Sequence, residues 1–590
     1  MADTRDGTLL NMKRRNPWIG CLLAATAALV GCAPKTNVSA TGNVPAAYSH
    51  VYMSIKEIWF NTDAAAGPDD TTWAKYPLTT PATVDLATAL GGQLNSITTG
   101  LNVPIGTYAQ IRLIPVDASD SLLSSASGLG AVYNSEVDYT DSDGAAHQVP
   151  LELLNPDRGL GVTASVQVKG DTTNILASSS SSSSSTDTSS TDPTTTDTTT
   201  TTSTGTTPAA TFQLAINVDG AKDIVPFTYS NVTGMLLNPH IVAYDQAAVG
   251  GISGTLDVSN LTGVSGASST SYLNIQVTAE SLSTDGTRHV AVNSAPVATD
   301  GTFTIYPLST SSSSPTSYDL VIHGPGIATI VIKGVPVSTI GDPSSVTPVN
   351  IGTVTPRAAT SFKVNLNTTN PLPAGVLVGF YQTLPGSTEV PYLIDAQPID
   401  PFSRTFSADQ SESTGNLDYG TYASGSNVTL TAANPTEGVS TYRVAATAPL
   451  FTDGVLTTTI TAPSSSSTLT VAVPTLAAAS GAALNAATVT ISKSSSTKYN
   501  KGELIFSHDG AIVQTASLDS LLTQSANGVL TISGLPGGSS SGQFADGIYY
   551  VSVRVWNTSD PSNTVVREIY PTALDLRSGA SLVNYQLNID

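Results

Sequence analysis

The feature that most limits the fold of this chain is the strict alternation of apolar and polar residues in many short stretches. Residues 273–280 alternate Leu, Ile, Val and Ala with Asn, Gln, Thr and Glu, and residues 549–556 alternate Tyr and Val with polar or larger residues. Successive side chains of a strand point to opposite faces, so such stretches form strands with one buried face. After residue 31 no stretch has the period of a long amphipathic helix, and residues 517–524 are the best candidate for a short one. The pattern predicts an all-β chain.

Composition supports this prediction. Only 11% of the residues are charged, so the chain lacks the Glu, Lys and Arg that helices carry on their solvent faces. With 590 residues it is too long for a single core. We therefore expect a string of β-sandwich-like domains with few short helices.

The charge and the cysteines exclude several classes of function. The formal net charge is −21, and such a surface repels phosphate backbones, so no nucleic-acid partner is expected. The chain has two cysteines, Cys21 and Cys32, both near its N-terminus. Beyond them, a disulfide framework, a cysteine-based zinc site and a thiol nucleophile are all excluded.

The N-terminus has the order of a secretory signal. A basic run at 13–15 precedes an apolar stretch at 18–31 that is too short to cross a bilayer. The stretch ends in Leu29, Val30, Gly31 and Cys32, which resembles the bacterial lipobox. That resemblance implies cleavage before Cys32 and acylation of its thiol. Residues 1–31 are thus the predicted signal peptide, with Met12 as a second possible start.

The anchor determines the expected location. No other segment reaches 18 consecutive apolar residues, so the mature chain is expected to be anchored to the membrane without spanning it. Ala33 stands where an aspartate commonly marks inner-membrane lipoproteins, which favours the outer membrane, on its periplasmic or its surface side. Residues 32–47 are predicted to be a polar tether with a reach of about 20 Å.

Residues 48–247 resemble a known bacterial family. The resemblance rests on Trp73 and on four short runs: Ile58-Trp59, Val84-Asp85-Leu86, 104–113 and Leu237–Ile241. These resemble domain of unknown function 4382, which implies a β-rich extracytoplasmic domain and no established activity. A tract of Ser and Thr at 178–207 is predicted to be a disordered insertion between two neighbouring strands, 162–168 and 212–218.

Three further domains are predicted. Residues 248–356 resemble the carboxypeptidase-regulatory or transthyretin-like β-sandwich, a structural module of surface proteins. Residues 357–474 and 475–590 contain more alternating runs and are predicted to form two more β-sandwiches.

Motifs for chemistry are weak. Residues 538–542 match G-x-S-x-G without the strand and helix that a nucleophile elbow needs, and 159–164 match a dinucleotide fingerprint but lead into a strand. Asp138, Asp141 and Asp143 lie near His147, yet Asp143-Gly144 is also a favoured hairpin turn. The six histidines stand singly in the sequence. We expect no catalytic residue, no metal site and no cofactor.

These observations favour a non-enzymatic envelope lipoprotein that serves adhesion, envelope structure or ligand presentation. The expected partners are the membrane, through the anchor, and extracellular polysaccharide or envelope proteins. An array of carbohydrate-binding modules is the alternative, with Tyr549, Tyr550 and Trp556 as a candidate aromatic platform, although packing in the core is the default for such residues.

Overall fold

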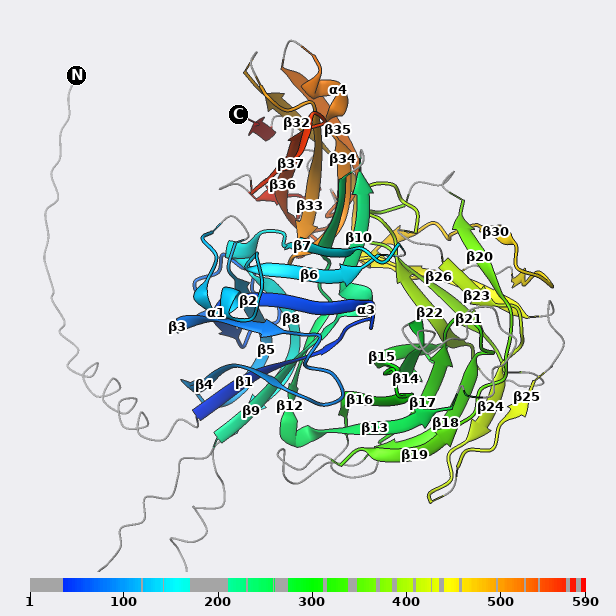
Figure 1. The fold of residues 1–590 in the computed structure, drawn as a ribbon. Helices are drawn as coiled ribbons and strands as arrows, with labels where there is room; N and C mark the ends of the chain where they lie inside the picture. The colour runs from blue at the N-terminus through cyan, green and yellow to red at the C-terminus, as the bar shows by residue number, and fades with distance from the viewer. Residues whose placement is uncertain are drawn as a thin grey trace, which may run out of the picture.

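The computed structural model describes residues 35–589 with gaps. The signal peptide 1–31, Cys32 and the tract 178–207 lie outside the described residues, and the gaps are 118–119, 142, 170–210, 230–231, 258, 260–273, 311–315, 338–346, 368–371, 385–389, 407–409, 426, 434–439, 456–458, 495–496, 525–526, 540–541, 569–572 and 580–584. Strands dominate this part of the chain, which confirms the all-β prediction (Figure 1). The α-helices within it are single turns, α1 (Ser124–Gly128), α3 (Gly220–Asp223) and α4 (Asp519–Leu522). Helix α4 confirms the short helix predicted at 517–524.

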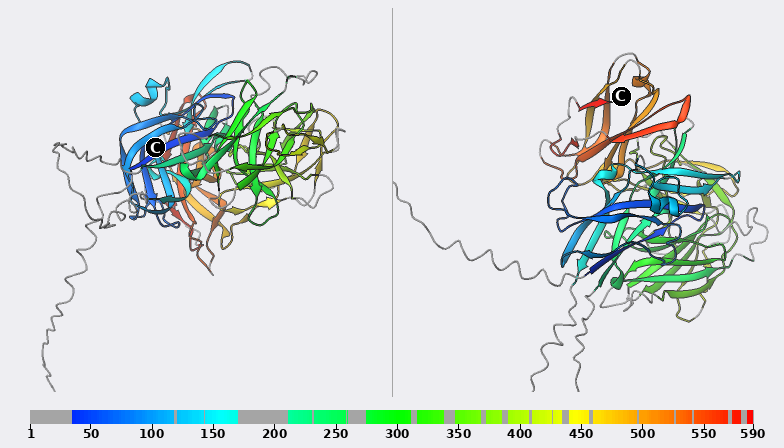
Figure 2. Two further views of the ribbon diagram at one scale, coloured as in Figure 1. Left: turned by 90° about the horizontal axis from the view of Figure 1, so that it is seen from below. Right: turned by 60° about the vertical axis from the view of Figure 1, so that its left-hand side comes forward.

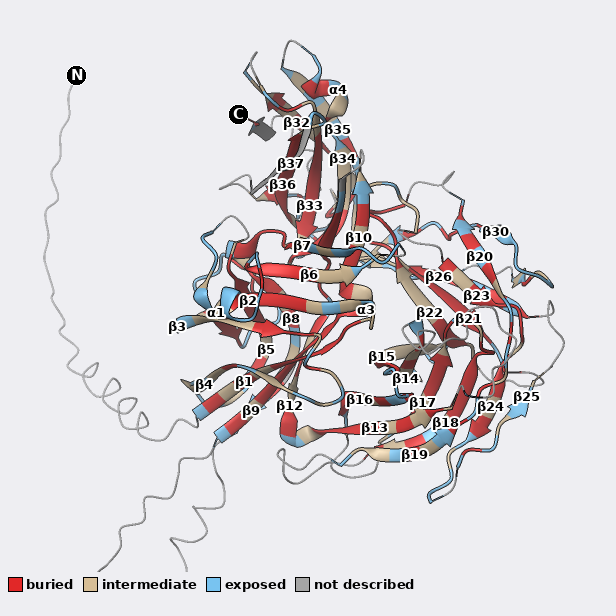
Figure 3. Ribbon diagram, viewed as in Figure 1, coloured by how far each residue is buried: buried red, intermediate tan, exposed pale blue. Residues whose placement is uncertain are grey.

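The first domain is built on a twelve-stranded sheet. Its strands are β1 (Lys35–Asn43), β2 (Tyr48–Asn61), β3 (Ala74–Asp85), β4 (Asn95–Asn102), β5 (Gly106–Pro115), β6 (Ser135–Thr140), β7 (Ala146–Glu152), β8 (Leu160–Val168), β9 (Thr211–Asp219), β10 (Ile224–Tyr229), β11 (Val232–Leu237) and β12 (Ile241–Asp245). The sheet order is β10-β11-β7-β6-β2-β5-β8-β12-β9-β1-β4, with β3 paired to β2. Apolar side chains from these strands form one core, and buried residues alternate with more exposed ones along many of the strands (Figure 3).

Strand β1 corrects the predicted tether at 32–47. Residues Lys35–Asn43 pair in parallel with β9, from Lys35 opposite Thr211 to Asn43 opposite Asp219, and antiparallel with β4. Thr36, Val38 and Ala40 alternate into the core and are 0% exposed. The buried residues of this segment are small or polar, so the sequence shows no apolar stripe. Such residues fit at β1 because the strand lies between β4 and β9.

The strands on either side of the Ser/Thr tract are also placed differently from the prediction. Strands β8 and β9 lie in the same sheet, but β12 separates them, pairing in parallel with β8 and antiparallel with β9. The tract thus links two strands of one domain that are not direct neighbours.

The second and third domains share a sheet. The second-domain strands are β13 (Val249–Leu256), β14 (Gln276–Leu282), β15 (His289–Pro296), β16 (Thr302–Ser309), β17 (Thr316–His323), β18 (Ile330–Val337) and β19 (Val349–Val354). The third-domain segment holds β20 (Ser361–Leu366), β21 (Leu377–Gln382), β22 (Tyr392–Pro398), β23 (Gln410–Ser413), β24 (Asp418–Thr421), β25 (Thr431–Ala432), β26 (Thr441–Thr447), β27 (Phe451–Thr452), β28 (Gly454–Val455), β29 (Ile460–Thr461), β30 (Thr468–Val471) and β31 (Ala477–Ala478). Strand β24 pairs in parallel with β18 and so extends the sheet β15-β14-β17-β18 into the third segment.

This shared sheet has a hydrophobic core on each face. Leu320 and Ile322 of β17 pack in the second-domain core, whereas Val321 between them packs in the third-domain core. Strands that are buried on both faces are apolar without alternation, as in Leu320-Val321-Ile322. The two domains are therefore joined by a common layer instead of following one another as separate sandwiches.

The fourth domain docks on the first. Its strands are β32 (Ala483–Ser492), β33 (Lys501–His508), β34 (Ala511–Ser517), β35 (Gly528–Gly537), β36 (Ile548–Asn557), β37 (Asp560–Glu568), β38 (Leu574–Asp575) and β39 (Tyr585–Asn588). Asp509 and Gly510 form the β33–β34 hairpin turn, both with positive φ, as Asp-Gly turns require. The turn inserts into the first domain, where Asp509 pairs with the buried guanidinium of Arg112 and the Gly161 amide donates to the Asp509 carbonyl at 3.1 Å. Both views of Figure 2 show the fourth domain against the first.

A small apolar core closes the junction of three domains. It contains Leu154, Phe227 and Leu236 of the first domain, Ala374 of the third, and Ile505 and Ile512 of the fourth. Beside it the Arg554 Nε of the fourth domain donates to the Glu152 Oε1 of the first at 3.1 Å, with both side chains nearly inaccessible to solvent. The described domains thus form one packed body.

Candidate functional site at a pocket between three domains

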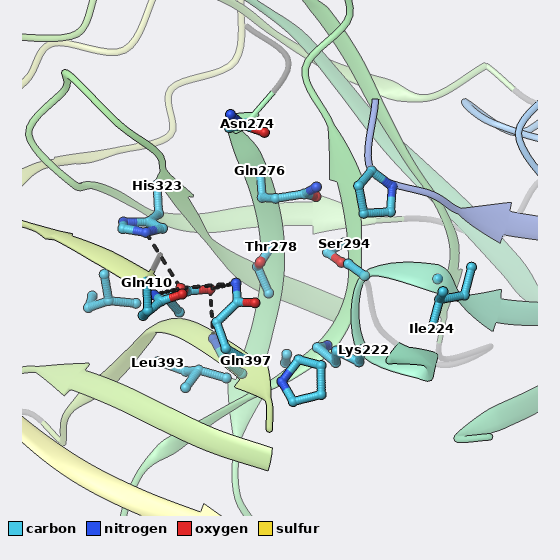
Figure 4. A pocket seen from close by; sticks show the side chains of 18 of the residues that line it. Lys222, Ile224, Asn274, Gln276, Thr278, Ser294, His323, Leu393, Gln397 and Gln410 are labelled. Atoms are coloured by element: carbon cyan, nitrogen blue, oxygen red, sulfur yellow. Dashed lines mark hydrogen bonds and ion pairs between the residues drawn. The ribbon is translucent and has the colours of Figure 1, made fainter. Parts of the chain in front are cut away.

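A cavity of about 460 Å³ lies where the first, second and third domains meet (Figure 4). The first domain contributes the turn of helix α3, which follows β9. The second domain contributes strands β14, β15 and β17, and the third contributes β22 and β23. A second cavity of about 320 Å³ shares Lys222, Ala291, Leu393 and Ala396 with it. We call the larger cavity the central pocket.

One wall of the central pocket is a polar corner around helix α3. Lys222 lies 2.9 Å from Asp219, and Asp219 also accepts a hydrogen bond from Asn43 at 3.0 Å. Burial alone would lower the pKa of Lys222, but the carboxylates of Asp219, Asp223 and Glu280 raise it above its ordinary value. Lys222 therefore keeps its charge, and that charge is already compensated by carboxylates of this wall.

The opposite wall holds a group of three ionisable side chains from two domains. His323 ends β17, Asp395 lies on β22 and Glu412 lies on β23. One nitrogen or oxygen atom of each lies within 4.8 Å of the others. Glu412 is 0% exposed, and the side chains of His323 and Asp395 are 12% and 14% exposed. We call this group the His323 cluster.

The amide of Gln410 joins the two carboxylates of the His323 cluster. Its Nε2 donates to Asp395 Oδ2 at 2.5 Å and to Glu412 Oε1 at 2.8 Å. Gln397 also donates to Asp395, at 3.1 and 3.2 Å. These neutral donors fix the two acidic groups in place without neutralising a charge.

Burial shifts the pKa values of two members of the His323 cluster, Glu412 and His323. It raises the pKa of Glu412 well above the ordinary range, the nearby Asp395 raises that pKa further, and the Gln410 hydrogen bond offsets only part of the rise. Burial lowers the pKa of His323 even though Asp395 opposes the change. The histidine is thus neutral near pH 7, and its ring nitrogens can act as ligands.

The acidic hairpin near His147 has the predicted turn structure. Asp141 Oδ1 accepts hydrogen bonds from the amides of Asp143 and Ala145, and Gly144 has a φ of 83°. His147 Nε2 lies 2.7 Å from Asp141 Oδ2. The turn prediction is confirmed.

The two other weak motifs fall in different kinds of structure. Residues 160–164 are part of strand β8, which confirms that the dinucleotide match is accidental. In the G-x-S-x-G match, Ser540 and Ser541 lie outside the described residues, and Ser539 forms an isolated bridge with Gly542. The predicted lipobox, Leu29 to Gly31 with Cys32, also lies outside them.

The candidate aromatic platform is not a surface. Tyr549 and Trp556 are 0% exposed and Tyr550 is 9% exposed. Trp556 packs edge-on against Tyr229 of the first domain, with ring centres 4.9 Å apart. Tyr549 lies in the core of the fourth domain, and Trp556, on the other face of β36, lies at the junction with the first domain.

Each of the six histidines lies within 4.0 Å of an aspartate, although each is isolated in the sequence. The pairs are His50–Asp85, His147–Asp141, His240–Asp223, His289–Asp319, His323–Asp395 and His508–Asp509. Among these six, only the His323 pair belongs to a group of three or more ligand-type residues in the described part of the chain.

No sequence motif joins His323, Asp395 and Glu412, which lie 72 and 17 residues apart along the chain. One local signal was available. Gln410 and Glu412 occupy the inward positions of β23, where the alternation calls for apolar residues. Polar residues in the buried phase of a strand indicate a polar site that another segment completes.

Comparison with known proteins gives little similarity over the whole chain. No curated protein matches it. Among solved structures, the Bacillus anthracis TIE protein is 8% identical, with 91% of this chain and 68% of that chain covered and a TM-score of 0.16. The Streptococcal ancillary pilin is 11% identical, with 57% and 98% covered and a TM-score of 0.12. No shared topology follows from such scores.

In the described part of the chain no helix has the length and hydrophobicity to cross a membrane. One family model matches part of the chain, over the first domain. Residues 36–239 match the family described as Domain of unknown function (DUF4382), which confirms the resemblance seen in the sequence. The match starts twelve residues before the predicted domain boundary at 48 and so includes strand β1. A DUF4382 domain is therefore detected at residues 36–239.

Proposed function

We propose that this chain is a non-enzymatic cell-envelope lipoprotein, acylated on Cys32, that presents a binding surface for adhesion or envelope structure at the outer membrane. The observation that carries the proposal is the packing of the four β-domains into one body. A buried ion pair, an inserted hairpin and a shared sheet hold them together. Such a body has a fixed surface to present, whereas domains on flexible linkers would move independently.

Replacement of Cys32 by Ser is expected to abolish lipid attachment. Metabolic labelling with palmitate should mark the wild-type protein, and Cys32→Ser should remain unlabelled because a hydroxyl does not replace the thiol in the lipobox. Cys21→Ser is the matched control, because Cys21 lies inside the predicted signal peptide and should not affect labelling. Equal labelling of wild type and Cys32→Ser would refute the proposed anchor.

The surface role is tested by protease treatment of intact cells. If the protein is displayed outward, added protease should remove it from whole cells while a periplasmic marker remains intact. Complete protection in intact cells, with digestion after the outer membrane is opened, would move the proposed function to the periplasm.

A further inference from the structure

The His323 cluster brings two buried acidic side chains together, and among the described residues no lysine or arginine forms an ion pair with either of them. Glu412 is fully buried, and its Oε2 atom has no hydrogen-bond partner among the residues that the structure describes. The Nδ1 atom of His323 is buried and also has none within this part of the chain. Buried polar atoms are almost always paired, so unpaired atoms of two residues in one cluster indicate a missing partner.

The missing partner should be positive. Two carboxylates converge here, and the side chain that links them, Gln410, supplies a neutral amide. Among the described residues the ion-pair contact of Asp395 is with His323, at 3.8 Å, and neither lysine nor arginine supplies a positive charge to it. Two neighbouring buried acidic groups are costly to ionise together without a counter-ion, and a bound cation removes that cost.

We propose that His323, Asp395 and Glu412 bind one divalent transition-metal ion, of the Zn²⁺ or Mn²⁺ class, between the second and third domains. One imidazole nitrogen and two carboxylate oxygens form the ligand set. Imidazole disfavours Ca²⁺ and Mg²⁺, which prefer oxygen ligands, while carboxylates and the lack of thiolates disfavour Cu⁺.

The distances suit such an ion. Ligand bonds of about 2.1 Å place two ligand atoms at most about 4.2 Å apart. The three atoms already lie within 4.8 Å of one another, so a small adjustment brings them to the ion. Asp395 and His323 also line the central pocket, so solvent or a ligand in that pocket could complete the coordination.

The ion would connect two domains. His323 belongs to β17 of the second domain, whereas Asp395 and Glu412 belong to strands of the third. Binding to the native arrangement alone should raise the melting temperature, because a ligand that binds only the folded state stabilises it by mass action. This inference replaces the expectation, based on sequence alone, that the chain has no metal site.

The test is zinc titration of the purified mature protein after treatment with EDTA. Calorimetry should show one Zn²⁺ per chain, and zinc should raise the melting temperature by several degrees. Glu412→Gln and His323→Ala should each weaken zinc binding at least tenfold. Glu412→Gln keeps the side-chain size and replaces the buried acidic group by a neutral amide, so it should remain folded, and circular dichroism of the metal-free variant checks this.

The matched control is His147→Ala. His147 also lies 2.7 Å from an aspartate, but it sits on an exposed hairpin far along the sequence from the cluster. Zinc binding should be unchanged in this variant. Absence of saturable zinc or manganese binding by the wild type would overturn the proposal. So would zinc binding that survives in folded Glu412→Gln, or that is lost in His147→Ala.

Discussion

Replacement of Arg554 by Met is expected to destabilise the docking of the fourth domain by about 3–5 kcal/mol, because it leaves the Glu152 carboxylate buried without a partner. Arg554 is 1% exposed, and its guanidinium lies 4.7 Å from the Phe227 ring centre and 4.9 Å from that of Trp556. Met can fill much of this space. The expected loss therefore arises from the charge left on Glu152 more than from packing.

The double variant Glu152→Leu with Arg554→Met separates these causes. A buried ion pair replaced by apolar residues is often neutral in stability, so most of the loss should be recovered. Hydrogen exchange of the β33 and β36 amides measures the local free energy of opening, which suits a chain of several domains. Arg577→Met is the control, because Arg577 and Asp575 form a pair that is about half exposed, and it should change stability by less than about 1 kcal/mol. If the double variant were as unstable as Arg554→Met, the charge explanation would fail.

The second large effect is a dependence of stability on pH through Glu503. Burial raises the pKa of Glu503 to about 8, from an ordinary value of 4.5, and the nearby Asp519 adds to the rise while Tyr229, Arg404 and Arg554 oppose it. Its folded pKa lies above its unfolded pKa, so the folded state holds a proton that the unfolded state releases. This contribution to stability is complete below about pH 4.5 and is lost as the pH rises toward 8.

Glu503→Gln should flatten this dependence. The loss of stability between pH 5 and pH 8 should be smaller in the variant than in the wild type, by on the order of 3 kcal/mol. Asp285→Asn is the control, because hydrogen bonds from Ser283 and Thr287 hold the pKa of that exposed carboxyl at about 2, below this pH range. Thermal melting in EDTA at both pH values measures the difference. Identical pH profiles for wild type and Glu503→Gln would show that Glu503 does not hold the proton.

Local patterns predicted the elements of this fold well. The alternation that predicts strands depends on the two-residue repeat of an extended chain, which does not depend on distant contacts. Asp-Gly pairs marked turns for the same reason, since positive φ is a property of the turn itself, as at Asp509-Gly510. Helix α4, Asp519–Leu522, also lies within residues 517–524, the best candidate for a short helix.

Features that depend on distant partners could not be predicted. Strand β1 is polar and small in character, and only its pairing with β9, about 176 residues away, gives it a core to face. Val321 breaks the alternation of β17 because a second core lies on the outer face of that sheet. Trp556 was a candidate for ligand contact in the sequence, but Tyr229 of the first domain packs against its ring, and no local pattern around Trp556 predicts this contact.

The His323 cluster follows the same rule. His323, Asp395 and Glu412 are ordinary residues in three separate strands, and no spacing motif joins them. The pairing of β17 with β14 and of β23 with β20 brings them to one pocket. When a site is assembled from separate sheets, the signal that remains in the sequence is a polar side chain at a buried position of a strand, as at Gln410 and Glu412.

The position of β1 has a mechanical consequence for a chain acylated on Cys32. Only residues 33 and 34 separate Cys32 from the first residue of β1, so the sheet begins within about 10 Å of the lipid. A linker of two residues does not allow the protein to rotate freely about its anchor or to extend across the periplasm. The end of the sheet where β1 and β9 begin, with Lys35 beside Thr211, would instead rest at the headgroups and set the tilt of all four domains. A partner would meet the protein at a constant height above the bilayer. Inserting residues between Cys32 and β1 would change that height without altering any binding contact.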